Sequence, residues 1–116
     1  DDVHSLDISN NNDIMIASYG GSAVEIYSTE GNLKSSIKVP EGHEVIWMAF
    51  HHGIGKIIVS TLVTKSDSLF LLGYSETGEL ENSVFFLSGS PYVGSHFRSH
   101  LNGTVAIRGW SSFTLI

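Results

Sequence analysis

The sequence contains no cysteine, which excludes disulfide bonds, thiolate zinc sites and cysteine nucleophiles. Long apolar runs are missing too, since no stretch approaches the roughly 20 apolar residues that a membrane-spanning helix needs. The segment from Asp1 to Ser9 carries acidic residues and an alternating pattern in place of the basic and apolar regions of a signal peptide. We therefore expect these residues to contain neither a membrane span nor a leader. The composition leaves the cellular compartment open.

Positive charge is scarce. Lysine and arginine together number 6 against 12 aspartate and glutamate residues, which gives a formal net charge of −6. The basic residues are spread singly along the chain, so no basic stripe exists to neutralise phosphates or to hold anionic lipid. The sequence therefore predicts no nucleic-acid partner and no membrane partner.

Helical periodicity is nearly absent, and the apolar residues recur instead with a period of two. Segments with this period are bounded by Gly, Asn, Asp and Ser clusters typical of turns. The first of them are residues 5–9, 14–17, 24–27 and 33–39. The pattern predicts an all-β fold of short antiparallel strands joined by hairpin turns.

The same strand pattern recurs later in the sequence. Ile57 to Ser60 repeats Ile14 to Ala17 at an offset of 43 residues. Tyr74 to Leu80 repeats Tyr27 to Leu33, with the shared form Tyr-Ser-x-x-Gly-x-Leu, at an offset of 47. The growth in offset lies between these segments, and we expect it in the loop from Val63 to Ser68, where an insertion costs only loop-closure entropy.

A third copy begins near Val93, because Val105 to Ile107 repeats the buried second strand 48 residues after Ile57. Four strands in each repeat of 43 to 48 residues form the blade of a β-propeller. We therefore predict a single partial propeller of about two and a half four-stranded antiparallel blades. Its predicted boundaries are 3–42 for blade one, 45–91 for blade two and 93–116 for a partial blade three. A β-sandwich or a β-trefoil is the alternative.

The residues of blade one resemble a known repeat family. The short apolar strand from Asp13 to Ala17, followed by the segment from Ala23 to Leu33, is similar to a repeat of the NHL type. The resemblance covers residues 3–87, with a looser match in the second repeat, and it implies a six-bladed propeller. Where the family commonly has Asp or Asn and Arg, near the turn between the second and third strands, this chain has Tyr19-Gly20-Gly21-Ser22.

Two and a half blades cannot close into a ring. Residues such as Ile14, Ile16 and Val59 would need a neighbouring blade on both sides, since each large apolar side chain left in water forgoes about 1.5–3 kcal/mol. Either the remaining blades of a longer chain cover these faces, or identical chains associate as a homo-oligomer. The sequence stops inside an apparent strand, Phe113 to Ile116, which favours the longer chain.

The histidines fall mainly on one edge of the predicted blades. His51 and His52 lie in the first turn of blade two, and His96 and His100 flank the corresponding turn of blade three. His96 and His100 would be about 13 Å apart along a strand, too far to share one metal ion. We therefore expect solvated or hydrogen-bonded turn histidines, and no metal site.

The turn glutamates Glu30, Glu76 and Glu79 fall on the same edge as these histidines. Paired carboxylates can do acid and base work only at a defined separation, which nothing in the sequence fixes. The glycine-rich segments Gly20-Gly21 and Gly53 to Lys56 lie in hairpin turns and do not precede a helix, so they form no phosphate-binding loop. The sequence predicts no catalytic residue and no cofactor.

The opposite edge carries exposed turn residues of another kind. Tyr19, Tyr92 and Trp110 fall at its turns, together with Asp67 in the longer turn of blade two. Aromatic side chains in surface loops offer a large contact area with a polar handle, and binding residues concentrate on such loops. We predict that these residues bind the ligand, whereas Trp47 packs in the core.

The leading functional hypothesis is a non-enzymatic propeller module that binds or scaffolds a protein partner through this edge. Two alternatives from other classes stay open. One is a propeller hydrolase or lyase with part of its site in missing blades, and the other is a carbohydrate-binding propeller lectin assembled from short chains. Because a fold does not supply a function, all three hypotheses rest on analogy even if the propeller fold is correct.

Overall fold

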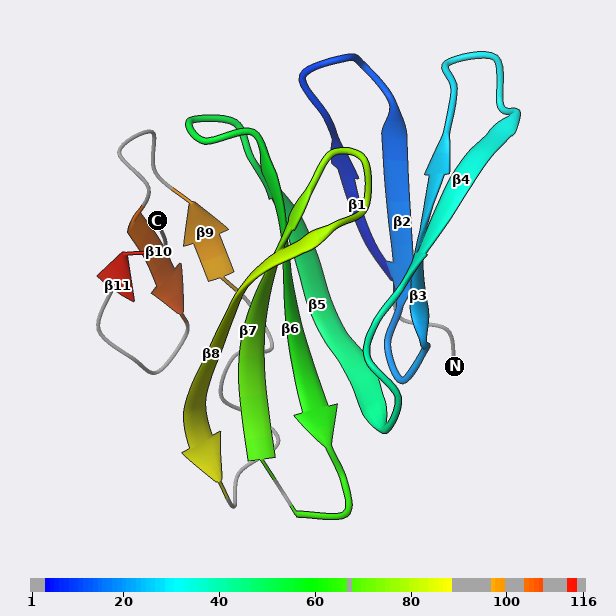
Figure 1. Cartoon of the computed structure of the whole chain (residues 1–116). Helices are drawn as coiled ribbons and strands as arrows, with labels where there is room; N and C mark the ends of the chain where they lie inside the picture. Colours follow the sequence, from blue (N-terminus) through cyan, green and yellow to red (C-terminus); the bar gives the residue numbers. More distant parts are fainter. Residues whose placement is uncertain (1–3, 67, 89–96, 100–103, 108–112, 115–116) are drawn as a thin grey trace.

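The chain runs back and forth through consecutive antiparallel strands (Figure 1). The computed structural model describes residues 4–66, 68–88, 97–99, 104–107 and 113–114. Every element among them is a strand, which confirms the predicted all-β class. This described part contains no helix that could cross a membrane, and each of its sheets is open.

Two four-stranded sheets follow one another along the chain. The first consists, in this order, of β1 (His4–Ile8), β2 (Ile14–Ser18), β3 (Ala23–Tyr27) and β4 (Leu33–Lys38). The second consists of β5 (His43–His51), β6 (Lys56–Val63), β7 (Ser68–Ser75) and β8 (Leu80–Ser88). A third sheet has the order β11 (Phe113–Thr114), β10 (Thr104–Ile107) and β9 (Phe97–Ser99). Because neighbours in sequence are neighbours in space, hairpins make every connection within the first two sheets.

The same turn closes the last hairpin of both four-stranded sheets. In the first sheet, the amide of Ser28 donates to the carbonyl of Asn32 at 2.8 Å, and the Ser28 hydroxyl accepts from the Asn32 amide at 3.3 Å. In the second, the amide of Ser75 donates to the carbonyl of Glu79 at 2.9 Å, and the Ser75 hydroxyl accepts from the Glu79 amide at 3.1 Å. The repeated Tyr-Ser-x-x-Gly-x-Leu segment therefore builds one local structure twice.

Glycine and a pairing irregularity complete this equivalence. Gly31 and Gly78 hold the left-handed backbone that the turn requires, with φ angles of 91° and 97°. The strand register shifts next to Tyr27 in the first sheet and next to Tyr74 in the second. Because a β-bulge raises the local twist, the last strands β4 and β8 twist relative to their sheets at the same position.

The extra residues of the second repeat lengthen its strands. β2 and β3 have 5 residues each, whereas β6 and β7 have 8 each. The connection between β6 and β7 is as long as the one between β2 and β3, so the prediction that the loop takes up the insertion is wrong. The added residues instead gain the ladder pairs of Leu62 with Leu69 and of Val63 with Ser68. The longer hairpin extends past the end of the first sheet (Figure 1).

The two four-stranded sheets pack face to face through one hydrophobic core, with β5 against β1 and β2. The first sheet contributes Met15, Ala17, Val24, Ile26 and Ile37, and the second contributes Val45, Met48, Phe50, Ile57, Val59, Leu72 and Tyr74. A slip of one residue in either sheet would turn these side chains to the other face. Burial of this face therefore fixes the register.

Only one face of β2 is covered, contrary to the expectation of a strand buried on both faces. Met15 and Ala17 point into the core and are buried, whereas Ile14 and Ile16 lie on the other face and are partly exposed. The equivalent strand β6 does meet the expectation, because the consecutive residues Ile57 to Ser60 are all buried. The difference arises because the first sheet has a neighbouring sheet on one side only within the described residues.

Polar side chains of β1 satisfy amides at the edge of the second sheet. The hydroxyl of Ser5 accepts from the amide of Met48 at 3.1 Å, and a carboxylate oxygen of Asp7 accepts from the amide of Phe50 at 2.7 Å. β5 is the first strand of its sheet, so one of its two edges has no paired strand. The β1 side chains thus complete hydrogen bonds that a bare edge would lack.

The second sheet is apolar on both of its faces. Away from the first sheet, Ile46, Ile58, Leu69 and Leu71 are buried. β9, in the third sheet, lies in contact with β5. Buried residues on both faces of β6 and β7 match their near-continuous apolar sequence.

Alanine substitutions at Met15 and at Leu6 should change stability by different amounts, because the two residues lie on the covered and the uncovered face of the first sheet. Met15→Ala removes a core side chain that is 1% exposed and should lower the free energy of unfolding by about 2–5 kcal/mol. Leu6→Ala, at a position 65% exposed on the other face, should change it by less than about 0.5 kcal/mol. Urea denaturation of both variants provides the measurement. Equal losses would contradict the assignment of the two faces.

Candidate functional site

The turns gather at two opposite edges of the sheets. The connections β1–β2, β3–β4, β5–β6 and β7–β8 lie at one edge, called here the upper edge, and β2–β3, β4–β5 and β6–β7 lie at the other, the lower edge (Figure 1). This separation follows from the meander, in which every second turn returns to the same side. Tyr19 therefore lies on the opposite edge from His52, Glu30 and Glu76, as the sequence predicts.

Tyr19 is an exposed aromatic residue on a fixed turn. Its side chain is 57% exposed at the lower edge. The adjacent backbone is held to the second sheet, because the amide of Gly20 donates to the carbonyl of Val45 at 2.7 Å and the amide of Val45 donates to the carbonyl of Gly21 at 2.9 Å. Gly20 takes a φ of 81°, which a residue with a side chain rarely adopts. The turn thus presents the ring to solvent from a paired backbone.

Asp67, Tyr92 and Trp110 lie outside the described residues, so their grouping with Tyr19 stays a prediction. The β6–β7 connection that contains position 67 is at the lower edge, and its described residues 64–66 are exposed. Trp47 is only partly buried on β5. Of the four predicted ligand-binding residues, Tyr19 is the one whose side chain is described.

His43 is a lower-edge residue that the sequence interpretation did not single out. Its Nδ1 is 2.8 Å from the hydroxyl oxygen of Thr61, and its ring lies against that of Phe70 with a centroid distance of 5.1 Å. Burial lowers the pKa of His43, because the charged imidazolium would lose solvation. At the start of a strand, after Pro40 and Gly42, the residue reads as part of a turn, and no local signal reveals its partners.

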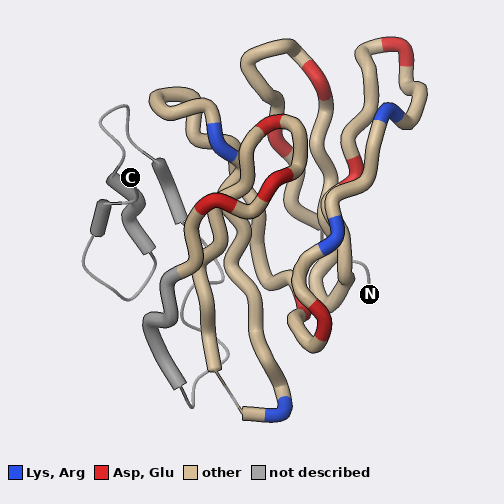
Figure 2. Tube along the Cα trace, viewed as in Figure 1, with Lys and Arg blue, Asp and Glu red and all other residues tan. Residues whose placement is uncertain are grey.

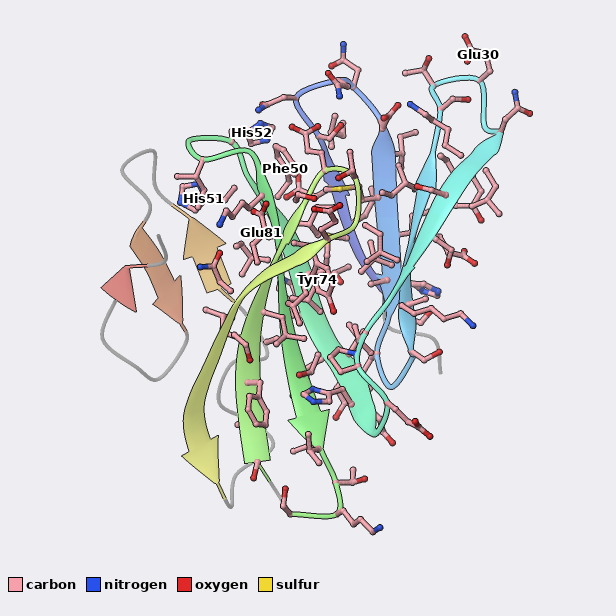
Figure 3. All side chains as sticks on the ribbon, in the orientation of Figure 1. Glu30, Phe50, His51, His52, Tyr74 and Glu81 are labelled. Carbon is pink, nitrogen blue, oxygen red and sulfur yellow. The ribbon has the colours of Figure 1, made fainter. Side chains whose placement is uncertain are left out.

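The upper edge corrects one prediction about the histidines. His51 is the last residue of β5 and is completely buried, so it is not a solvated turn histidine. Strand alternation turns its side chain to the opposite face from Phe50, toward the buried side of the second sheet away from β1. His52 does lie in the turn and is exposed, with its Nδ1 2.7 Å from the side-chain oxygen of Asn10 and its ring edge-on to Phe50 (Figure 3).

A cleft of about 180 Å³ opens between the two four-stranded sheets at the upper edge. Its floor is apolar, with Met15, Ile26 and Ile57 from facing strands. Its rim is polar and charged. The rim residues are Ser9, Asn11, Asp13, Lys34, Ser35, Glu76 and Thr77. The cleft therefore has an apolar base and a ring of donors and acceptors, a combination found in binding sites for small ligands.

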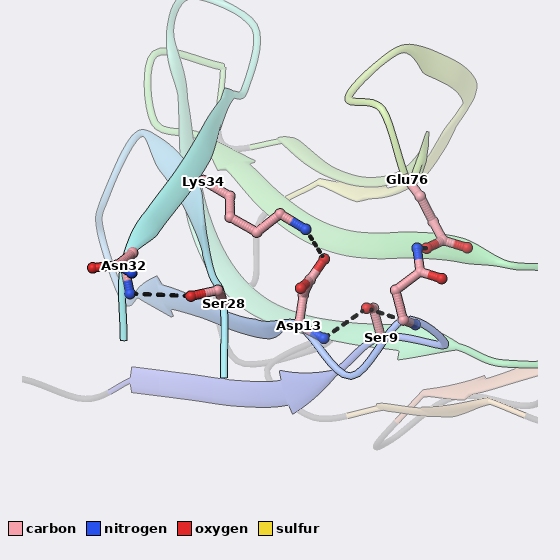
Figure 4. Close-up of polar contacts among 7 residues, drawn as sticks. Ser9, Asp13, Ser28, Asn32, Lys34 and Glu76 are labelled. Atoms are coloured by element: carbon pink, nitrogen blue, oxygen red, sulfur yellow. Dashed lines mark hydrogen bonds and ion pairs between the residues drawn. The ribbon is translucent and has the colours of Figure 1, made fainter. Parts of the chain in front are cut away.

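The charged groups of this rim already have partners within the protein (Figure 4). The Nζ of Lys34 lies 2.8 Å from a carboxylate oxygen of Asp13, and the amide of the Asn11 side chain donates to Glu76 at 3.1 Å across the two sheets. No group of three His, Asp or Glu residues within the described part is placed to hold a metal ion. The arrangement suits recognition of a small polar ligand better than proton transfer, because each carboxylate already has a partner.

Sequence reasoning missed the cleft. It singled out Glu76 as a turn residue, but Asp13 and Lys34 stand 21 positions apart and Asn11 and Glu76 stand 65 apart. Acidic residues do gather along the upper turns, as expected for Glu30, Glu76 and Glu79 (Figure 2). Only the folded pairing of strands shows which of these charges meet.

Replacing His43 with glutamine should flatten the pH dependence of stability. Because the folded protein disfavours protonation of His43, the unfolded chain takes up that proton first, and stability should fall as pH drops below about 6.5. Comparing unfolding free energies at a pH near 7.5 and one near 5.5 measures this loss. His43→Gln should lose less than the wild type does, because glutamine takes up no proton in this range. An identical loss in the two proteins would rule out this role for His43.

Comparison with known proteins bears on the fold alone. No family model and no curated protein matches the sequence. The chain is similar to the solved structure of a protein of unknown function from Bacteroides caccae, with a TM-score of 0.66 and 15% sequence identity. The match covers 89% of this chain and 36% of that one, so this chain spans about a third of the length of the solved protein. The sheet arrangement thus recurs within a longer protein.

Proposed function

We propose that this chain is part of a β-propeller that serves as a non-enzymatic binding module, with its protein partner held at the lower edge. The propeller is supported by two successive four-stranded meanders that share a turn and a bulge position and pack on each other through one core. In a propeller such meanders stack radially, each inner strand against the next blade. The resemblance to NHL-type repeats stays a proposal of the same kind.

One observation carries the binding role: an aromatic side chain, Tyr19, is held in water by a turn that is hydrogen-bonded to the next sheet. Exposed aromatic residues on rigid supports contribute disproportionately to protein interfaces, because little conformational entropy is lost on binding. The longer β6–β7 hairpin has its turn at the same lower edge and extends past the end of the first sheet (Figure 1). Asp67, Tyr92 and Trp110 are the further contacts that we propose for this edge.

A binding role also fits the upper edge better than catalysis does. The carboxylates of Asp13 and Glu76 lie in one cleft, but each is engaged by a donor of the same protein. A hydrolase would need a free acid and a free base at a defined spacing. In the described residues, the carboxylates at the rim of the cleft are instead bonded to Lys34 and Asn11.

Tyr19→Ala should weaken binding of a peptide partner by at least about tenfold, a loss typical of an aromatic anchor. We would screen the isotope-labelled chain by NMR against a panel of synthetic 15-residue peptides, expecting saturable shifts at Tyr19, Gly20 and Gly21. Leu33→Ala is the matched control, since Leu33 is equally exposed, at 57%, but lies beside the upper edge. It should leave peptide affinity unchanged.

Three results would overturn the proposal in different ways. Shifts confined to Asp13, Lys34 and Glu76 would move the ligand site to the upper cleft. Saturable binding of methyl pyranosides without any peptide binding would favour the lectin alternative. Equal losses for the Tyr19 and Leu33 variants would remove the special role of the tyrosine.

A further inference from the structure

The face of the first sheet that turns away from the second sheet is unusually apolar. This surface, called here the outward face, carries Leu6 and Ile8, which are 65% and 49% exposed, and Ile14, Ile16 and Tyr27, which are partly exposed. Strand pairing groups them, since Leu6 is opposite Ile16 and Ile8 is opposite Ile14. A sheet with one solvated face normally alternates apolar and polar residues, so this face has the composition of a covered surface.

Its equivalent in the second sheet is indeed covered. Leu6 opposite Ile16 corresponds to Met48 opposite Val59, and Ile8 opposite Ile14 corresponds to Phe50 opposite Ile57. Tyr27 corresponds to Tyr74 by the shared turn. All five counterparts, Met48, Phe50, Ile57, Val59 and Tyr74, are at most 3% exposed, because the first sheet packs on them. The outward face thus repeats, position by position, a surface that a four-stranded sheet already covers in this protein.

We propose that the outward face docks a further four-stranded antiparallel sheet of the same repeat, carried by the same polypeptide. Its packing surface should repeat the surface that the first sheet presents to the second, built from Met15, Ala17, Val24 and Ile26. The solved protein with this fold continues well beyond the matched region, so related sheet stacks contain more chain. The inference rests on the propeller part of the proposed function and not on ligand binding at Tyr19.

Hydrogen-bonding groups specify the inner strand of this partner sheet. The hydroxyl of Ser5 accepts from the amide of Met48, whose counterpart on β1 is the amide of Leu6. β1 is the first strand of its sheet, so this amide lies at a sheet edge. The amide of Ile8, the counterpart of Phe50, already donates to the Asp7 carboxylate at 2.8 Å. The partner's inner strand should therefore carry a hydroxyl acceptor opposite Leu6, in the manner of Ser5.

One charged residue makes a second copy of this chain the weaker candidate. Glu25 stands on the outward face, opposite Ile16, where the second sheet has Leu72 opposite Val59. The hydroxyl of Tyr27 donates to the Glu25 carboxylate at 3.0 Å, which leaves its other oxygen for a donor from the partner. Packing this face on its own copy would instead bring two glutamates together, and like charges facing across a sheet interface are destabilising.

The absence of cysteine from the sequence makes a direct test practical. A tandem variant, in which residues 1–42 are added before residue 1, supplies the first sheet with a copy of the proposed neighbour. Leu6→Cys in the original unit should react with a maleimide at least about tenfold more slowly in the tandem protein than in the 116-residue chain. Leu33→Cys is the matched control, because its counterpart Leu80 stays 45% exposed on a covered face. Its reaction rate should not change.

Two further measurements test whether a sheet of the same polypeptide or a second copy of the chain covers the outward face. Ser5→Ala in the added unit should restore fast labelling of Leu6→Cys, because the acceptor for the amide of residue 6 is lost. Unchanged labelling of Leu6→Cys in a tandem protein with β-type circular dichroism would overturn the proposal, and this result would leave peptide binding at Tyr19 unaffected. Labelling of the 116-residue chain that slows with concentration, together with a dimer in sedimentation equilibrium, would overturn it in favour of a second copy.

A variant of the single chain tests the face even if the tandem protein does not fold. Leu6→Ser combined with Ile8→Ser should preserve the urea midpoint and reduce binding of the dye ANS, because both side chains lie on an open apolar surface. A marked drop in the midpoint would show that these residues already belong to a core, and would overturn the proposed docking face.

Discussion

A β-sheet with apolar side chains on both faces must be covered on both faces, and this constraint governs the arrangement of the whole chain. The second sheet illustrates it, since Ile57, Ile58 and Val59 are consecutive and all buried. Alternating side chains of one strand cannot reach a single core, so neighbouring sheets must stand on either side. Ile58, Leu69 and Leu71 show this requirement in the second sheet, because they are buried although they do not belong to the core shared with the first sheet.

Because the sheets pack through their faces, the turns at their upper and lower edges are not needed for the core. Hydrogen bonds from amides of β5 to the side chains of Ser5 and Asp7 hold β1 and β5 together. The pairing of Gly20 and Gly21 with Val45 fixes one turn against the next sheet. The turns are thereby fixed in space without contributing to the core. A rigid scaffold that presents exposed loops is the usual arrangement in binding proteins, since loop residues can vary without loss of the fold. The position of Tyr19 follows from this arrangement.

The sequence predicts local structure well here and tertiary burial poorly. The strands and the turn from Ser28 to Asn32 could be predicted, because alternation and glycine position act over a few residues. Which face of β2 is buried could not be, since Ile14 to Ala17 is apolar throughout and the choice depends on where the next sheet lies. The burial of His51 and the meeting of Asp13 with Lys34 depend on contacts between distant segments and leave no local pattern. The extra residues of the second hairpin went into strands because ladder pairs and buried side chains stabilise them more than an open loop would.

The two edges then differ in a way that matters for function. At the upper edge Lys34 pairs with Asp13 within the first sheet, and the Asn11 side chain donates to Glu76 across the two sheets, so this edge helps to hold the sheets together. At the lower edge the amides of Gly20 and Val45 join the sheets, and the side chain of Tyr19 is 57% exposed. An aromatic side chain that is exposed on a turn with a paired backbone is available for contact with a partner. The polar groups of the upper edge are bonded within the protein, whereas the lower edge exposes an aromatic side chain. This difference is the physical reason to look for a partner at the lower edge.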